Sequence, residues 1–152
     1  WISTFQYVVD EDLQIAVGSS LTIQAGTTVK FTNATMFVFG ILNAVGTVDQ
    51  PIIFTSETTW RGMRFVNPIN SSRIVNGVIE NVTGTALELR GLLNISDSTV
   101  RLSTQGIWVR SNDTSIVGNE IYSNDIGVIN DRAISFDLLW ITLSETMWLG
   151  FR

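Results

Sequence analysis

The chain has 152 residues, a length that favours a single domain. Apolar residues make up 45% and charged residues 15%, and the net charge is −5. Because the sequence contains no cysteine and no histidine, it excludes a disulfide framework, a zinc finger and a catalytic triad built on either residue. The acidic balance also argues against a nucleic-acid-binding protein, which normally carries a basic stripe.

The N-terminal segment 1–12 is predicted to be a cap or lead-in to the domain that follows. Its first nine residues, WISTFQYVV, are apolar and aromatic and match no later part of the chain. Asp10, Glu11 and Asp12 follow directly, and in a strand they would point to alternating faces. We interpret them as a solvated acidic entry, with a calcium site as the alternative.

Short alternating runs from residue 21 onwards indicate β-strands. In 21–23, 29–31, 37–39 and 107–109, apolar residues occur at every second position. Gly, Asn, Asp and Ser cluster between such runs, which is typical of tight turns. No stretch of a dozen residues keeps a helical apolar period, and no run of about 18 apolar residues suggests a membrane span. The expected class is therefore all-β.

An internal repeat is the most specific feature of the sequence. Ile74, Ile95 and Ile116 are 21 apart, and so are Ile79, Val100 and Ile121. Ile53 lies one further step before Ile74, and Asn76, Asp97 and Gly118 make a candidate column of turn residues. Self-similarity at this period predicts a solenoid in which each coil packs on its neighbours. The predicted interior residues are Leu21, Ile23, Val29, Phe31, Ile53, Ile74, Ile79, Ile95, Val100, Ile116 and Ile121.

One such repeat is long enough for three short strands and three turns, which close one coil. Residues 13–152 are thus predicted to form one domain, a single-stranded parallel β-helix of about six to seven coils. Strands of successive coils would pair about 4.8 Å apart.

Residues 18–56 resemble the opening coils of right-handed parallel β-helix proteins of the pectate-lyase-like superfamily. Their pattern G-x-x-L-T-I-x-x-G-T-x-V-K-F is met by GSSLTIQAGTTVKF at 18–31, and G-x-L-x-A-x-G-T is met at 40–47. The segment 116–128, IVGNEIYSNDIGV, is similar to a coil of the same superfamily. The resemblance covers about residues 13–130 and implies a right-handed β-helix, in a superfamily that includes both enzymes and non-catalytic surface proteins.

The residues that the resembled enzymes use are not matched. The chain has no His for the G-H-G segment of polygalacturonase-like members, and Arg61, Arg64 and Pro68 do not fit the R-x-P-x-x-R spacing of pectate-lyase-like members. Glu80 and Arg101 are one step of 21 apart, which predicts an ion pair between coils, worth at most about 1 kcal/mol if exposed. We expect no catalytic residue, no cofactor site and no metal site.

Five N-x-S/T sequons indicate an extracellular glycoprotein, although a chain rich in Ser, Thr and Asn contains some sequons by composition alone. Their acceptors are Asn33, Asn70, Asn81, Asn94 and Asn112. Exposed tryptophans are candidates for glycan or subunit contacts, and Trp108 should point outward because Ile107 and Val109 point inward. Trp140 and Trp148 are further candidates.

The sequence therefore predicts a non-catalytic structural protein that is secreted or displayed at the cell surface. We expect a glycosylated subunit that forms a homopolymer by head-to-tail or lateral stacking into a filament or surface layer, because open solenoid ends expose pairing edges. One alternative is a carbohydrate-binding or adhesin module, and another is a fragment of a polysaccharide-degrading β-helix enzyme.

Overall fold

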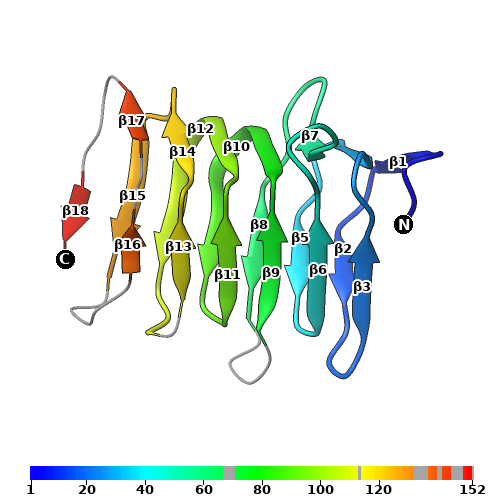
Figure 1. Cartoon of the computed structure of the whole chain (residues 1–152), viewed down its shortest axis with the longest axis horizontal. Helices are drawn as coiled ribbons and strands as arrows, with labels where there is room; N and C mark the ends of the chain where they lie inside the picture. Colours follow the sequence, from blue (N-terminus) through cyan, green and yellow to red (C-terminus); the bar gives the residue numbers. More distant parts are fainter. Residues whose placement is uncertain (67–70, 113, 132–136, 140–141, 145–148, 152) are drawn as a thin grey trace.

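The computed structural model describes residues 1–66, 71–112, 114–131, 137–139, 142–144 and 149–151, the last three segments as backbone alone. Within these residues all regular structure is β-strand, and the strands pair in parallel. The strands stack into a β-solenoid of about six turns, which confirms the predicted fold class (Figure 1). The described residues contain no helix long and apolar enough to cross a membrane.

Three ladders run along the solenoid. The first contains β1 (Gln6–Val9), β4 (Thr28–Phe31), β7 (Ile52–Thr55), β10 (Gly77–Leu89), β12 (Thr99–Val109), β14 (Glu120–Tyr122) and β17 (Thr142–Ser144). The second contains β2 (Leu13–Ile15), β5 (Met36–Val38), β8 (Met63–Phe65), the C-terminal parts of β10 and β12, β15 (Ile126–Asn130) and β18 (Leu149–Phe151). The third contains β3 (Ser20–Ile23), β6 (Ile41–Val45), β9 (Ser72–Val75), β11 (Leu93–Ser96), β13 (Ser115–Val117) and β16 (Asp137–Leu139).

The regular step between coils is confirmed in the middle of the chain. Ile74, Ile95 and Ile116 pair in register in the third ladder. In the first ladder, Ile79 of β10 pairs with Val100 of β12, which pairs with Ile121 of β14. Of the predicted interior residues, all are buried except Leu21, which packs half-buried against the core, and Ile53.

The placement of Ile53 in the column of Ile74 is wrong. Ile53 lies in β7 of the first ladder and pairs with Val78, whereas Ile74 lies in the third ladder opposite Ala44. Longer loops lengthen these coils, so Ile79 pairs with Phe54, which lies further back than one regular step. Because side chains alternate along a strand, Ile52 and Phe54 point into the core, and Ile53 between them is half-buried.

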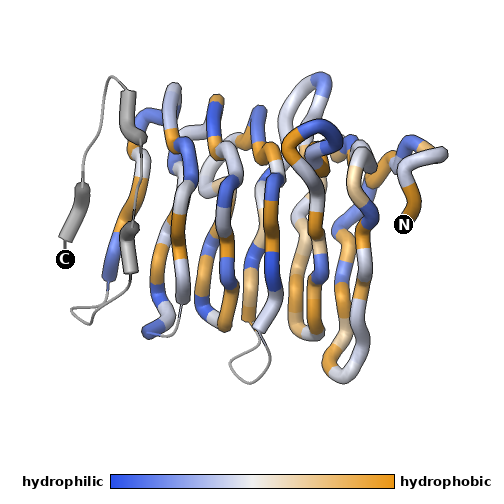
Figure 2. Tube along the Cα trace, in the orientation of Figure 1, coloured by the Kyte–Doolittle hydropathy of each residue, from blue (hydrophilic) through white to orange (hydrophobic). Residues whose placement is uncertain are grey.

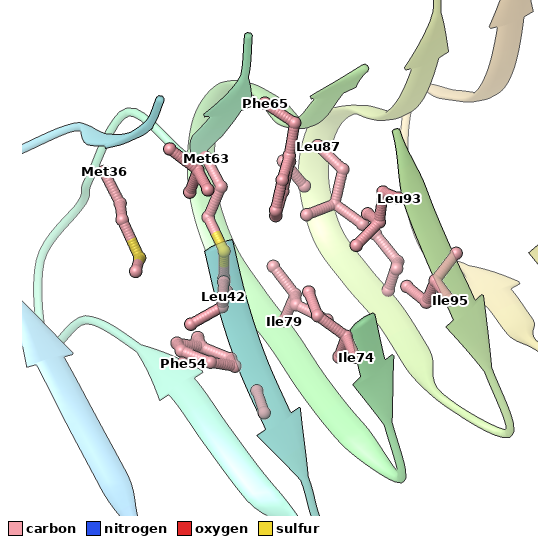
Figure 3. Packing of buried hydrophobic residues seen from close by; sticks show 14 of the residues in the cluster. Met36, Leu42, Phe54, Met63, Phe65, Ile74, Ile79, Leu87, Leu93 and Ile95 are labelled. Carbon is pink, nitrogen blue, oxygen red and sulfur yellow. The ribbon is translucent and has the colours of Figure 1, made fainter. Parts of the chain in front are cut away.

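Hydrophobic residues recur along the strands of successive coils (Figure 2), and the buried ones form one apolar core. Methionine, leucine, isoleucine and phenylalanine side chains from successive coils meet inside it (Figure 3). Trp60 is fully buried and stacks on Phe31 with ring centroids 4.2 Å apart, while its Nε1 donates to the carbonyl oxygen of Glu80 at 2.8 Å. The indole is thus both packed and hydrogen-bonded.

Columns of turn residues with positive φ separate the ladders. The predicted column Asn76, Asp97 and Gly118 has φ angles of 47°, 51° and 66°. A second column has the same conformation at Asn81, Leu102 and Ser123. Asn, Asp and Gly tolerate this left-handed conformation, which explains the residue types of the first column and Asn81, whereas Leu102 and Ser123 adopt it without that tolerance.

Buried polar side chains form hydrogen bonds with backbone groups at the turns. The side-chain oxygen of Ser98 accepts from the backbone N–H of Gly77 at 3.0 Å, and Asn119 Oδ1 accepts from the N–H of Ser98 at 3.0 Å. Asn119 Nδ2 donates to the carbonyl oxygen of Ile95 at 3.0 Å. Since residues 77, 98 and 119 occupy one column, these bonds join three successive coils.

The lead-in segment 1–12 contains the first strand of the first ladder, because β1 pairs with β4. Trp1 stacks on Tyr7 with ring centroids 4.5 Å apart and packs against the core. Its amino group donates to the carbonyl oxygen of Thr22 at 2.7 Å, and its own carbonyl oxygen accepts from the N–H of Gln24 at 2.9 Å. The segment is therefore attached to the β3 region as well as to β4.

Candidate functional site

The outer surface of the second ladder carries one row of side chains across successive coils. The row consists of residues that pair in register, namely Phe37, Arg64, Glu88, Trp108 and Ile129. Their strand neighbours, such as Leu87 and Leu89 beside Glu88, are buried in the core. Because side chains alternate along a strand, this row lies on the outside.

Glu88 is the centre of a charged cluster on this surface. Its carboxylate lies 2.6 Å from Arg90 Nε, 3.1 Å from Arg110 Nη1 and 3.4 Å from Arg64 Nε. The Glu88 side chain is only 7% exposed, whereas the three arginine side chains are 35–51% exposed. One covered carboxylate therefore holds three guanidinium groups at the surface.

Trp108 points outward beside this cluster, as the alternation predicted. Ile107 and Val109 are buried, and Trp108 is half-buried. The indole Nε1 donates to Asp131 Oδ2 at 2.8 Å, and the guanidinium of Arg110 lies 4.6 Å from the ring centroid. The indole is thus fixed by one hydrogen bond and one cation–π contact.

These residues form what we call the arginine face: Arg64, Glu88, Arg90, Trp108, Arg110 and Asp131. Three positive and two negative side chains give the face a net charge of +1, although the whole chain carries −5. It is a local concentration of cationic groups on an acidic protein.

Sequence reasoning found Trp108 but missed the charged residues around it. A step of 21 from Glu88 leads to Val109, but Glu88 pairs with Trp108 because the register shifts between Val82 and Thr85. Glu88 also pairs with Arg64, which lies further back than one such step. A search at a fixed period therefore does not bring these residues together. Strand alternation was the available signal, because each of these residues follows or precedes an apolar residue that points inward, which predicts that it lies on the outside.

A second charged row lies on the first ladder and includes the predicted ion pair. Arg101 Nη2 lies 2.7 Å from Glu80 Oε2, which confirms the pairing between coils. Thr55 donates to Glu80 Oε1 at 2.9 Å, and Arg101 Nη1 donates to the Tyr122 hydroxyl at 2.8 Å. The hydrogen bonds with Tyr122 and Glu80 raise the pKa of Arg101 above its usual value. The row ties together four coils.

The acidic segment Asp10 to Asp12 lies exposed beside β2. Asp12 Oδ1 accepts from the backbone N–H of Thr35 at 2.8 Å, which links it to the next coil. Among the residues that the structure describes, no three Asp or Glu side chains converge as a metal site would require. The contact of Asp12 is structural.

The sequons differ in how the fold uses them. Asn33, Asn94 and Asn112 are exposed. Asn81 is half-buried with a φ of 60°, and its Nδ2 donates to Thr55 Oγ1 and to the carbonyl oxygen of Ser56, both at 3.2 Å. Asn70, like Trp140 and Trp148, lies outside the residues whose side chains are described.

An open groove of about 400 Å³ runs over the turns between the third and first ladders, where Asn76, Asp97 and Glu120 contribute polar groups. It lacks the convergent cationic groups of the arginine face.

Comparison with family models, with curated proteins and with solved structures gives no match for this chain. The arginine face therefore stands on its own geometry as the candidate site.

Proposed function

We propose that this chain is a non-catalytic, extracellular structural protein, a glycosylated subunit of a filament or surface layer. The observation that carries the proposal is the use of its charged side chains. Ion pairs join neighbouring coils, among them Lys30 with Glu57, Arg101 with Glu80, and Arg110 with Glu88. Asp12 accepts a hydrogen bond from the following coil, and Asp131 accepts one from the preceding coil. Carboxylates engaged in this way stabilise the stack.

Assembly and localisation belong to the same proposal. Parallel ladders extend by addition of a strand to an outer edge, so a second solenoid can join head to tail or pack laterally. The exposed acceptors Asn33, Asn94 and Asn112 support a glycosylated, extracellular protein, since their side chains reach solvent.

Light scattering across a range of concentrations, together with negative-stain electron microscopy, tests the structural role. The proposal predicts growing, elongated particles, and a monomer at all concentrations contradicts it. Degradation of pectin or glucan that is lost in Glu80→Gln or Glu88→Gln would contradict the non-catalytic role. Intact mass of native material tests glycosylation, because the mass of the bare polypeptide would exclude it.

A carbohydrate-binding role is the second candidate, and the outward Trp108 beside Arg110 favours it. Aromatic and arginine side chains on a flat surface are suited to sugar rings and their polar substituents. A glycan array with wild type and Trp108→Ala tests this role. Binding that Trp108→Ala weakens supports it, and the absence of any bound glycan contradicts it.

A further inference from the structure

The arginine face has more donor groups than its own carboxylates use. Each guanidinium carries five N–H donors, and the contacts with Glu88 engage one nitrogen each of Arg64, Arg90 and Arg110. Arg110 has one further contact, at 3.8 Å, with Asp131. Since the three side chains are one third to one half exposed, the remaining donors are available to an anion from solvent.

The face is also organised before any ligand binds. Glu88 holds the three guanidiniums from below, and Arg110 is in addition stacked over Trp108. Free arginine side chains lose rotamer freedom when they bind a ligand, and these contacts remove part of that cost in advance. A tethered cluster is therefore a better anion receptor than three independent surface arginines.

We propose that the arginine face binds a sulfated polysaccharide. A sulfate monoester offers three terminal oxygens in a tetrahedral arrangement, so it can accept from two arginines at once without displacing Glu88. The guanidinium is more weakly hydrated than an ammonium group and suits a weakly hydrated anion. The arginines come from three successive coils, Arg64 from the coil of β8, Arg90 after β10 and Arg110 after β12, which spans about 10 Å along the solenoid axis.

The charge of the face favours a polysaccharide over a nucleic acid. Duplex DNA carries one negative charge for about every 1.7 Å of its axis and is bound by strongly basic surfaces. The arginine face has a net charge of only +1, and the rest of this chain of net charge −5 repels a densely charged polymer that extends past the face. A polysaccharide with separated sulfate groups presents fewer charges, and Phe37, whose ring lies 5.6 Å from the Arg64 guanidinium, adds apolar surface for the sugar.

The proposal rests on the carbohydrate-binding candidate and names its ligand class. Binding of dextran sulfate with a low degree of sulfation, polygalacturonate and neutral dextran is measured by calorimetry or biolayer interferometry for wild type, Arg90→Ala, Arg64→Ala and Arg73→Ala. Arg73 is the matched control, because it is exposed, loses the same charge and lies in β9 on the third ladder. Thermal unfolding of each variant verifies that it is folded.

We expect wild type to bind dextran sulfate with an affinity that falls as salt rises, because the contacts are ionic. Arg90→Ala and Arg64→Ala should each weaken binding about five- to tenfold, and Arg73→Ala less than about twofold. Equal losses in all three variants, or polygalacturonate binding as tightly as dextran sulfate, would overturn the assignment. Glycan-array binding that depends on Trp108 without binding of dextran sulfate would refute the sulfate proposal alone. If no carbohydrate binds, both proposals fail.

Discussion

The side chain of Asn119 offers the sharpest test of how the coils are held together. It is 1% exposed, accepts from the N–H of Ser98 and donates to the carbonyl oxygen of Ile95, both at 3.0 Å. Asn119→Ala leaves the buried N–H of Ser98 without its acceptor and takes one hydrogen bond from the Ile95 carbonyl oxygen. A cavity the size of an amide group remains beside them.

The magnitude follows from those two groups. Leaving a buried donor or acceptor without a partner costs about 1–3 kcal/mol, and water that enters the cavity recovers part of this. We therefore expect Asn119→Ala to lower the free energy of unfolding by about 2–4 kcal/mol. Asn124→Ala should behave alike, because Asn124 accepts from Ser103 N–H and donates to the carbonyl oxygen of Val100 at the same distances.

Urea unfolding followed by circular dichroism measures the difference. Asn94→Ala is the matched control, because Asn94 lies on the exposed face of β11, and its substitution should change the free energy of unfolding by less than about 0.5 kcal/mol. If Asn119→Ala were no more destabilising than Asn94→Ala, the asparagine would not hold the coils together, and the reasoning would be refuted.

Three further changes test separate parts of the structure. The Thr27 hydroxyl is buried without a hydrogen-bond partner, so Thr27→Val should raise the free energy of unfolding by about 1 kcal/mol in urea titrations. A free energy of unfolding below that of wild type would indicate a partner for that hydroxyl. Gly106→Ala should lower the free energy of unfolding by about 2–3 kcal/mol in the same titrations, because the new Cβ would meet the Gly127 carbonyl oxygen at 2.4 Å; an unchanged value would contradict this close packing. The hydrogen bond with Lys30 lowers the pKa of Glu57 below its ordinary 4.5, so its contribution to stability is present above that value and is lost as the pH falls through the lowered pKa. Glu57→Gln should therefore be less stable than wild type at about pH 7 and equal to it at about pH 2 in thermal unfolding, and a gap that persists in acid would exclude the ion pair as its cause.

The parts of the fold that follow from a fixed period could be predicted from the sequence. Ile74, Ile95 and Ile116 stack as expected because the coils that carry them have equal length. Glu80 and Arg101 meet for the same reason. Turn chemistry was readable at the corner of Asn76, Asp97 and Gly118, whose residue types tolerate positive φ, but not at the corner where Leu102 and Ser123 have the same conformation.

Features that depend on unequal coils could not be predicted in this way. Ile53 was misplaced because the loops after β6 and β7 lengthen their coils, and tertiary pairing then decides which residues face inward. Trp60 lies in a connection between strands, so no alternation marked it as buried. The charged residues around Trp108 are offset from the regular step by the register shift within β10 and β12.

Glu88→Gln tests the central claim, that the carboxylates of this solenoid stabilise it through ion pairs and hydrogen bonds between coils. If Glu88 is structural, the substitution removes the charge that holds three arginines, and the free energy of unfolding should fall by about 1–2 kcal/mol. Glu120→Gln, at an exposed position of β14, should change it by less than about 0.5 kcal/mol. Residues kept for chemistry are often costly to the fold, and their replacement stabilises. A Glu88→Gln variant more stable than wild type would therefore contradict the structural account.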